Sequence, residues 1–183
     1  MTKTILCLGD SLTKGYGSTE TKFTYPSHLK EVLKSFGSYN IINAGVIGDT
    51  SIGALNRIDG LLRTYQPYLV ITCIGTNDML LNTNPAVTKS NIISICNKVS
   101  QFGARNLLLG VPNWFNGVPI TVAVDHPMYA EIGQQLGIYV QTGGLALYES
   151  DSMWRFDNVH LNNFGYMGWS YYVGQAMNYG GLL

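Results

Sequence analysis

Three residues of the chain have the types and the spacing needed for attack of a serine hydroxyl on an ester. Ser11 follows a short apolar run, and Asp157 and His160 stand three positions apart near the end of the chain. A serine hydroxyl is a weak nucleophile until a neighbouring base takes its proton, and an imidazole suits this task because it titrates near neutrality. A carboxylate one turn away can bond the other ring nitrogen and fix its tautomer. We therefore expect Ser11 to be the nucleophile, His160 its base and Asp157 the group that orients the base.

Two further residues, Gly48 and Asn77, are candidates for binding the oxyanion that forms when an ester is attacked. Gly48 has no side chain, so its backbone N–H can approach a substrate closely. The Asn77 amide supplies a side-chain donor, and the Ser11 N–H is a third candidate. In known hydrolases the loss of one such donor costs about 10²–10³ in turnover. The sequence therefore predicts an oxyanion hole formed by Ser11, Gly48 and Asn77.

The elements that must position these residues alternate between strands and helices. Apolar runs predict five strands, at residues 4–8, 39–43, 68–74, 106–111 and 138–140. Apolar residues at helical spacing predict a helix after each strand, the last one at residues 162–178. This alternation predicts a parallel sheet with helices on both faces, because right-handed crossovers place them there. Ser11, Gly48 and Asn77 follow the first three strands, at the edge where such sheets bind ligands.

Some local features are predicted as well. We expect loops at residues 13–23 and 143–159, the second of which carries Asp157. A helix should begin at Asn84-Pro85, because asparagine caps helices and proline suits their first position. The second helix is expected to bury one stripe of side chains, formed by Ile52, Leu55, Ile58, Leu62 and Tyr65.

Other residues near the candidate site have simpler interpretations. We expect structural roles for His28, which lies within a helix, and for His126, which stands beside a proline that opens one. Asp10 precedes the nucleophile and should hold the local turn through hydrogen bonds. Four loop aromatics should border the cleft, where they either line an acyl or aryl pocket or anchor their own loops: Trp114, Phe115, Trp154 and Phe156.

Four short blocks, in order along most of the chain, resemble the SGNH or GDSL hydrolase family. The blocks are Gly9-Asp10-Ser11-Leu12, Asn43-Ala44-Gly45 with Gly48-Asp49-Thr50, Gly75-Thr76-Asn77-Asp78, and Asp157-Asn158-Val159-His160. The resemblance implies a flavodoxin-like, three-layer α/β/α sandwich with a five-stranded parallel sheet. It also implies the nucleophile, base, orienting carboxylate and oxyanion hole named above. The likeness is greatest to small bacterial members that act as arylesterase, thioesterase and lysophospholipase, although Leu161 stands where many members carry proline.

Length and composition exclude several classes of protein. The 183 residues fit a single domain over 1–183, and 11 basic residues balance 11 acidic ones without a basic run, so we expect no nucleic-acid partner. No apolar stretch approaches the ~18 residues of a membrane span, and no secretion signal is visible, which predicts a cytoplasmic protein. Cys7, Cys73 and Cys96 fall in apolar segments, and this favours free core thiols over disulfides.

Competing chemistries lack their signatures. The glycine-rich stretch after the first strand has Lys14 where a phosphate-binding loop needs its second glycine. A G-x-S-x-G nucleophile elbow and a histidine–cysteine cluster with zinc spacing are both missing from the sequence. The expected mechanism needs no metal and no cofactor.

The sequence thus predicts a hydrolase of carboxylic esters that works through an acyl-enzyme on Ser11. Its expected substrates are small aryl or short-to-medium acyl esters, with thioesters and lysophospholipids as further options. One alternative is a carbohydrate O-acetyl esterase of the same family. Another is a non-catalytic, flavodoxin-like binding module, since a fold does not fix a function.

Overall fold

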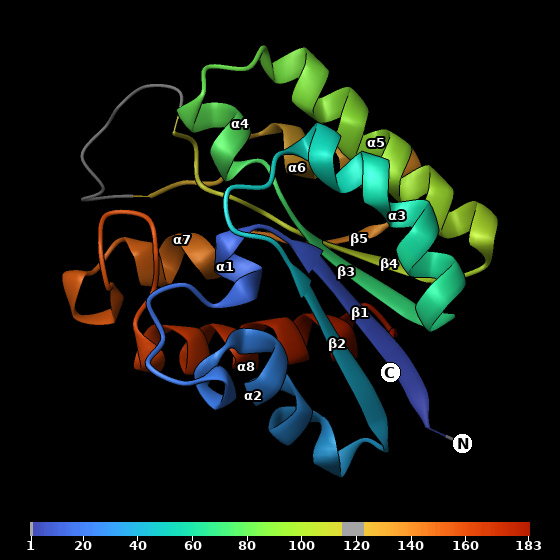
Figure 1. Cartoon of the computed structure of the whole chain (residues 1–183), viewed down its shortest axis with the longest axis horizontal. Coiled ribbons are helices and arrows are strands. Elements are labelled where there is room, and N and C mark those ends of the chain that lie inside the picture. The colour runs from blue at the N-terminus through green and yellow to red at the C-terminus, as the bar shows by residue number, and fades with distance from the viewer. Residues whose placement is uncertain (1, 115–122) are drawn as a thin grey trace.

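The computed structural model describes residues 2–114 and 123–183, and its centre is a five-stranded sheet (Figure 1). Every neighbouring pair of strands in this sheet is parallel. From one edge to the other, the strands are β2 (Tyr39–Gly45), β1 (Lys3–Gly9), β3 (Leu69–Cys73), β4 (Arg105–Leu109) and β5 (Tyr139–Gln141). This is the strand order of flavodoxin-like folds, so the predicted fold class is confirmed.

Helices cover both faces of the sheet and make it the middle of three layers (Figure 1). On one face, α2 (Tyr25–Val32) packs against α8 (Asn163–Tyr179). On the other face, α3 (Ser51–Tyr65) packs against α5 (Pro85–Phe102), and α5 packs in turn against α6 (Met128–Leu136). The central strands β1 and β3 are therefore shielded from water on both sides, as their apolar side chains require.

Helix α5 begins where the sequence predicts. The Asn84 side chain accepts a hydrogen bond from the Ala86 N–H at 2.9 Å, and Pro85 takes the first helical position. Proline costs nothing there, since its missing N–H would have no partner within the helix. In the described residues, neither α5 nor any other helix is long and apolar enough to cross a bilayer.

The core lies around the two central strands. The side chains of residues 5–8 in β1 and 69–73 in β3 are buried almost completely. Burying one such isoleucine or leucine stabilises the fold by about 1.5–3 kcal/mol. Cys7, Cys73 and Cys96 are buried and free of disulfides, as predicted.

Three short helices lie in segments whose sequence did not indicate them. They are α1 (Ser11–Lys14), α4 (Thr76–Leu80) and α7 (Gly144–Glu149). Single 3₁₀ turns add to them: η1 (Thr21–Phe23), η2 (Leu33–Ser35) and η3 (Ser152–Trp154). The prediction of loops throughout 13–23 and 143–159 is therefore wrong in part. An element of three to six residues completes fewer than two turns, which is too short for apolar periodicity to reveal it.

The predicted buried stripe of α3 is also wrong at its two ends. Ile52 is 50% exposed and Tyr65 38%, whereas Ile58 and Leu62 are buried together with Ala54. At about 100° per residue, Ile52 lies about 120° around the helix from Ile58, outside the face that meets the sheet. Tyr65 is the last residue of the helix.

Candidate active site

Ser11 is the first residue of helix α1 and follows β1 after a sharp change of direction. The Asp10 carboxylate accepts a hydrogen bond from the Leu12 N–H at 2.9 Å and so caps the helix, as predicted. Gly9 is required at the end of β1, because a Cβ there would lie 2.1 Å from the Thr13 hydroxyl oxygen and 2.4 Å from the Cys73 carbonyl oxygen. The tight turn therefore places the Ser11 hydroxyl at the carboxyl edge of the sheet.

The carboxyl group of Asp10 is itself fully buried beneath the serine. Burial raises its pKa to about 7, and the Asp49 and Asp78 carboxylates also raise it, although the Leu12 N–H acts in the opposite direction. No described residue pairs with its second oxygen. Asp10 thus holds the turn that precedes α1.

Ser11, His160 and Asp157 form a chain of hydrogen bonds. The Ser11 Oγ lies 2.8 Å from His160 Nε2, although the two residues are 149 positions apart. On the other side of the ring, His160 Nδ1 lies 2.8 Å from Asp157 Oδ2 and 3.0 Å from Oδ1. The structure therefore brings together the three side chains that the sequence singled out, in the predicted order.

One turn of backbone at residues 157–160 sets the contact between Asp157 and His160. Asp157 Oδ1 accepts the backbone N–H groups of Val159 at 2.8 Å and of His160 at 2.7 Å. Burial alone would raise the pKa of Asp157, but these N–H donors and the imidazole outweigh it, so the pKa lies below its usual value. The carboxylate is therefore ionised where it meets the ring.

The segment that carries this pair is tied to the start of α8 and to the loop after α1. The Asn162 amide donates to the Met153 carbonyl at 2.8 Å, and the Phe156 N–H donates to the His160 carbonyl at 2.8 Å. The Tyr16 ring lies 4.6 Å from the imidazole, centroid to centroid. These contacts hold the imidazole against the residues that follow Ser11.

Gly48 lies in the loop after β2, and Asn77 lies in the first turn of α4, which follows β3 along the same edge of the sheet. Gly48 has φ +76°, a left-handed conformation that favours glycine, and a Cβ there would meet nothing within 4 Å. The Asn77 amide donates to the Asp49 carbonyl at 2.8 Å, which uses one of its two N–H groups. Among the described residues, we find no acceptor for the backbone N–H of Ser11 or of Gly48. The candidate donors are thus available for a ligand.

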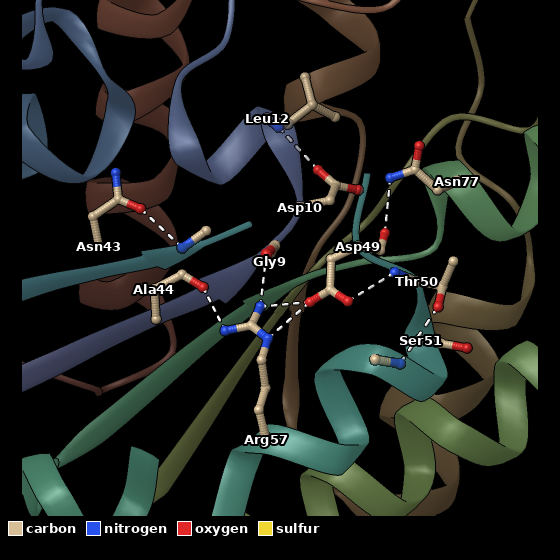
Figure 2. Close-up of polar contacts among 12 residues, drawn as sticks. Gly9, Asp10, Leu12, Asn43, Ala44, Asp49, Thr50, Ser51, Arg57 and Asn77 are labelled. Carbon is tan, nitrogen blue, oxygen red and sulfur yellow. Dashed lines mark hydrogen bonds and ion pairs between the residues drawn. The ribbon is translucent and has the colours of Figure 1, made fainter. Parts of the chain in front are cut away.

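Two charged side chains to which the sequence assigned no role, Asp78 and Arg57, connect these segments, and Figure 2 shows the contacts of Arg57. Asp78 is buried and accepts hydrogen bonds from the Ser51 N–H at 2.8 Å, the Ser51 hydroxyl and the Thr88 hydroxyl at 3.3 Å. Arg57, on α3, bonds Asp49 and two strand-end carbonyls. The sequence holds one hint of this, since an aspartate directly follows both Gly48 and Asn77. Nothing in it distinguishes Arg57 from an ordinary exposed arginine.

Of the loop aromatics, some pack against neighbouring rings and anchor their loops, and others are exposed to solvent. Trp154 meets the Tyr148 ring edge-on at 5.8 Å, which indicates that it anchors its own loop. Phe156 packs against Tyr16 at 6.0 Å and is 59% exposed. Trp114 is partly buried against the core, and Phe115 lies outside the described residues. A role in an acyl or aryl pocket stays a prediction, for which Phe156 is the best placed.

The remaining histidines serve the fold. His126 Nδ1 accepts the Met128 N–H at 3.1 Å where α6 begins, and the His28 ring lies edge-on to Tyr171 at 5.5 Å. Within residues 2–114 and 123–183, no group of three or more His, Cys, Asp or Glu side chains could hold a metal ion.

Comparison with known proteins points to the same family as the four sequence blocks. The curated relatives include esterase TesA of Pseudomonas aeruginosa, 36% identical over 116 residues, which are 61% of this chain and 57% of that protein. Thioesterase 1/protease 1/lysophospholipase L1 of Escherichia coli is 34% identical over 59% of this chain and 50% of its own length. The chain thus matches about half the length of these relatives.

Solved structures extend the likeness to almost the whole chain. A crystal structure of TesA superposes with a TM-score of 0.87 and 26% identity, covering 99% of this chain and 100% of that one. The SGNH-hydrolase family esterase AlinE4 superposes with a TM-score of 0.66 and 29% identity over 76% of this chain and 75% of its own. Residues 7–167 match the family described as GDSL-like lipase/acylhydrolase. The chain therefore belongs to the GDSL-like lipase/acylhydrolase family.

Proposed function

We propose that this protein hydrolyses carboxylic esters through an acyl-enzyme formed on Ser11. The observation that carries the proposal is the hydrogen-bonded chain from the Ser11 hydroxyl through both ring nitrogens of His160 to the Asp157 carboxylate. This arrangement supplies a nucleophile, a base and a group that orients the base. The relatives named esterase, arylesterase and lysophospholipase support the same reaction class.

The acylation step follows from the order of these contacts. As the Ser11 Oγ attacks the ester carbonyl carbon, His160 Nε2 takes the hydroxyl proton. The Asp157 carboxylate holds the Nδ1–H of the ring and stabilises the imidazolium that forms. When the tetrahedral intermediate collapses, His160 gives the proton to the departing alcohol oxygen and the acyl group stays on Ser11.

Deacylation repeats the sequence with water as the nucleophile. His160 takes a proton from the water as its oxygen attacks the acyl carbon, and then returns the proton to the Ser11 oxygen as the carboxylic acid leaves. In both steps the negative charge on the carbonyl oxygen would be met by the N–H groups of Ser11 and Gly48 and by the second N–H of Asn77. Each donor of this kind contributes about 10²–10³ in turnover.

The exposed side chains beside these donors favour an apolar acyl or aryl group in the substrate. Val46 and Ile47 precede Gly48 and are 47% and 60% exposed; Leu80 ends α4, Leu81 follows it, and they are 48% and 68% exposed. Apolar side chains lose unfavourable contact with water when they cover an acyl chain or an aromatic ring. The proposed substrates are therefore aryl esters and short-to-medium acyl esters, thioesters or lysophospholipids.

A panel of substrates tests this assignment. We expect turnover of p-nitrophenyl esters from acetate to laurate, with kcat/KM changing with chain length, and little release of acetate from acetyl-xylan. Ser11→Ala serves as the blank for each substrate. Activity confined to acetyl-xylan would indicate a carbohydrate O-acetyl esterase instead, and no turnover of any substrate would favour a binding module.

We also propose that the protein acts in a reducing compartment, the cytoplasm. Three buried cysteines without disulfides agree with this location. Fractionation of the cells that make the protein checks it: recovery with the cytoplasmic fraction is expected, and recovery with the secreted or periplasmic fraction would contradict it.

A further inference from the structure

The guanidinium of Arg57 binds three separate segments at the carboxyl edge of the sheet (Figure 2). Its Nε and one terminal nitrogen contact Asp49 Oδ2 at 2.8 and 2.7 Å. The other terminal nitrogen donates to the Ala44 carbonyl at 2.7 Å, and the first donates also to the Gly9 carbonyl at 2.9 Å. A guanidinium is rigid and planar, so these contacts fix the three segments relative to one another.

Each of these three contacts lies next to a residue of the proposed site. Gly9 ends β1 two residues before Ser11, and Ala44 is near the end of β2, whose following loop carries Gly48. The Gly9 carbonyl accepts a second hydrogen bond from the Val46 N–H at 3.0 Å. Arg57 therefore ties the strand that presents the nucleophile to the loop that presents the oxyanion donor.

Asp49 extends the connection to the third donor. Its Oδ2 meets Arg57, its Oδ1 accepts the Thr50 N–H at 3.0 Å, and its carbonyl accepts the Asn77 amide at 2.8 Å. Because Asp49 directly follows Gly48, a movement of Asp49 shifts the position of the Gly48 backbone. Because the Asp49 carbonyl accepts the Asn77 amide, the same movement changes the orientation of that amide. The position of this one residue thus controls two of the three proposed oxyanion donors.

Burial and packing show that this arrangement is closely fitted. Only 9% of the Asp49 side chain and 24% of the Arg57 side chain are exposed. Gly53, in the first turn of α3, leaves room for the carboxylate, because a Cβ there would lie 2.0 Å from Asp49 Oδ1. Charge-assisted hydrogen bonds that are partly shielded from water are short and directional, so they hold their groups more firmly than surface pairs do.

We propose that Arg57, acting through Asp49, is a positioning residue that holds the Gly48 N–H and the Asn77 amide in the geometry of the oxyanion hole. The proposal rests on the esterase function proposed above. Arg57 does not touch the substrate, and its effect on the reaction passes through the two donors. Binding of the ground-state ester should depend on it little, whereas stabilisation of the oxyanion should depend on it strongly.

The central test compares Arg57→Lys with Arg63→Lys. Lysine keeps the charge but cannot bond three segments at once, whereas Arg63 is exposed near the other end of the same helix. For Arg57→Lys we expect kcat to fall on the order of 10- to 100-fold, as a misplaced donor requires, with KM almost unchanged. Arg63→Lys should keep the wild-type kcat and KM. The pH profile should keep its shape in both variants, because neither substitution touches His160.

Two further measurements separate positioning from a general loss of structure. The serine oxygen adds to the carbonyl carbon of an aryl trifluoromethyl ketone and gives a hemiketal whose negative charge lies on the former carbonyl oxygen. The affinity of this inhibitor should therefore fall by the same factor as kcat/KM in Arg57→Lys. Asp49→Asn, which weakens the same contact from the other side, should give the same selective loss of kcat. The double variant should lose little more than either single variant, because the two residues act through one contact.

The possible outcomes either support the proposal or reject it. Equal kcat values for Arg57→Lys and Arg63→Lys would overturn it. A change of Arg57→Lys that appears in KM and not in kcat would also overturn it, and so would a loss of activity that is fully explained by the fraction of unfolded protein, determined from urea denaturation. If Arg57→Lys does not fold, Asp49→Asn decides by the same criteria. Failure of the proposed function is distinguishable, since the wild-type protein would then turn over no ester.

Discussion

At the scale of single residues, the candidate site depends on three side chains that are joined by hydrogen bonds and that we propose act as one unit. Ser11 contacts His160 at 2.8 Å, and His160 contacts Asp157 at 2.8 Å. None of the three can carry out its proposed step without the next, since the hydroxyl needs a base and the base needs a fixed tautomer. The loss of one member should therefore remove most of what the whole unit contributes.

We predict that Ser11→Ala and His160→Ala each abolish nearly all ester turnover while the protein stays folded. The double variant should be scarcely slower than either, because effects within such a unit are not additive. Steady-state ester kinetics on the three variants checks this, with circular dichroism as the control for folding. Near-normal turnover in His160→Ala at neutral pH would show that another group is the base.

Asp10 affects stability, because its carboxyl group is buried and only one of its two oxygens has a hydrogen-bond partner in the described residues. Its pKa is raised from 3.8 to about 7, mainly by burial. Between these two pH values the folded state binds a proton that the unfolded state has lost, so stability must fall as pH rises. The full effect corresponds to about 4 kcal/mol above the folded-state pKa. An amide at this position would keep the bond to the Leu12 N–H without this cost.

We therefore predict that Asp10→Asn is more stable than the wild type near and above neutral pH and that the difference shrinks towards pH 3.8. Urea denaturation of both proteins at a series of pH values measures it. Burial raises the pKa of the buried Glu149, and the Asp10 carboxylate raises it further, so Asp10→Asn removes this second contribution and changes stability in the same direction. A stability difference that stays constant with pH would contradict the raised pKa.

At the scale of elements, helix α3 supports the site through its first two turns. Its start is capped by Thr50 and held by Asp78, and Arg57 projects from it to the ends of β1 and β2. The Asp49 carboxylate lies over the first turn only because residue 53 is glycine. Two glycines on this helix, Gly53 and Gly60, therefore differ in what a methyl group would meet.

We predict opposite results for Gly53→Ala and Gly60→Ala. Alanine in a helix interior is favoured over glycine by about 1 kcal/mol. At Gly60 a Cβ meets nothing within 4 Å, so stability should rise and activity should not change. At Gly53 the new methyl group displaces the Asp49 carboxylate, so kcat should fall on the order of 10-fold. Thermal unfolding and ester kinetics on the pair provide the measurement, and equal activities would show that the carboxylate position is unimportant.

The elements also show which features a sequence can predict. The five strands, the start of α5 and the ends of β1 and β3 followed from apolar runs and from capping residues. Helices α1, α4 and α7 did not, because four to six residues are too few for periodicity to appear. The contacts of Arg57 with Asp49, Ala44 and Gly9 could likewise not be predicted, because they depend on how α3 packs against the ends of β1 and β2.

At the scale of the whole molecule, the parallel sheet explains how distant residues form one site. The order β2-β1-β3-β4-β5 places the ends of β2, β1 and β3 side by side. The segments that follow these ends carry Gly48 in a loop, Ser11 at the start of α1 and Asn77 in the first turn of α4. The turn at residues 157–160 closes the site from the other end of the chain, just before α8. The four short sequence blocks predicted that these residues lie close together, because each block follows a strand or precedes a helix at the carboxyl edge of the sheet.

Treatment of the protein with a fluorophosphonate, followed by peptide mass mapping of the modified residue, tests most directly whether Ser11 is the nucleophile. We predict one adduct, on the Ser11 hydroxyl, formed rapidly by the wild type and absent from Ser11→Ala. In His160→Ala the adduct should form far more slowly, because the serine has lost its base. No adduct, or an adduct on a residue other than Ser11, would contradict the assignment of Ser11 as the nucleophile.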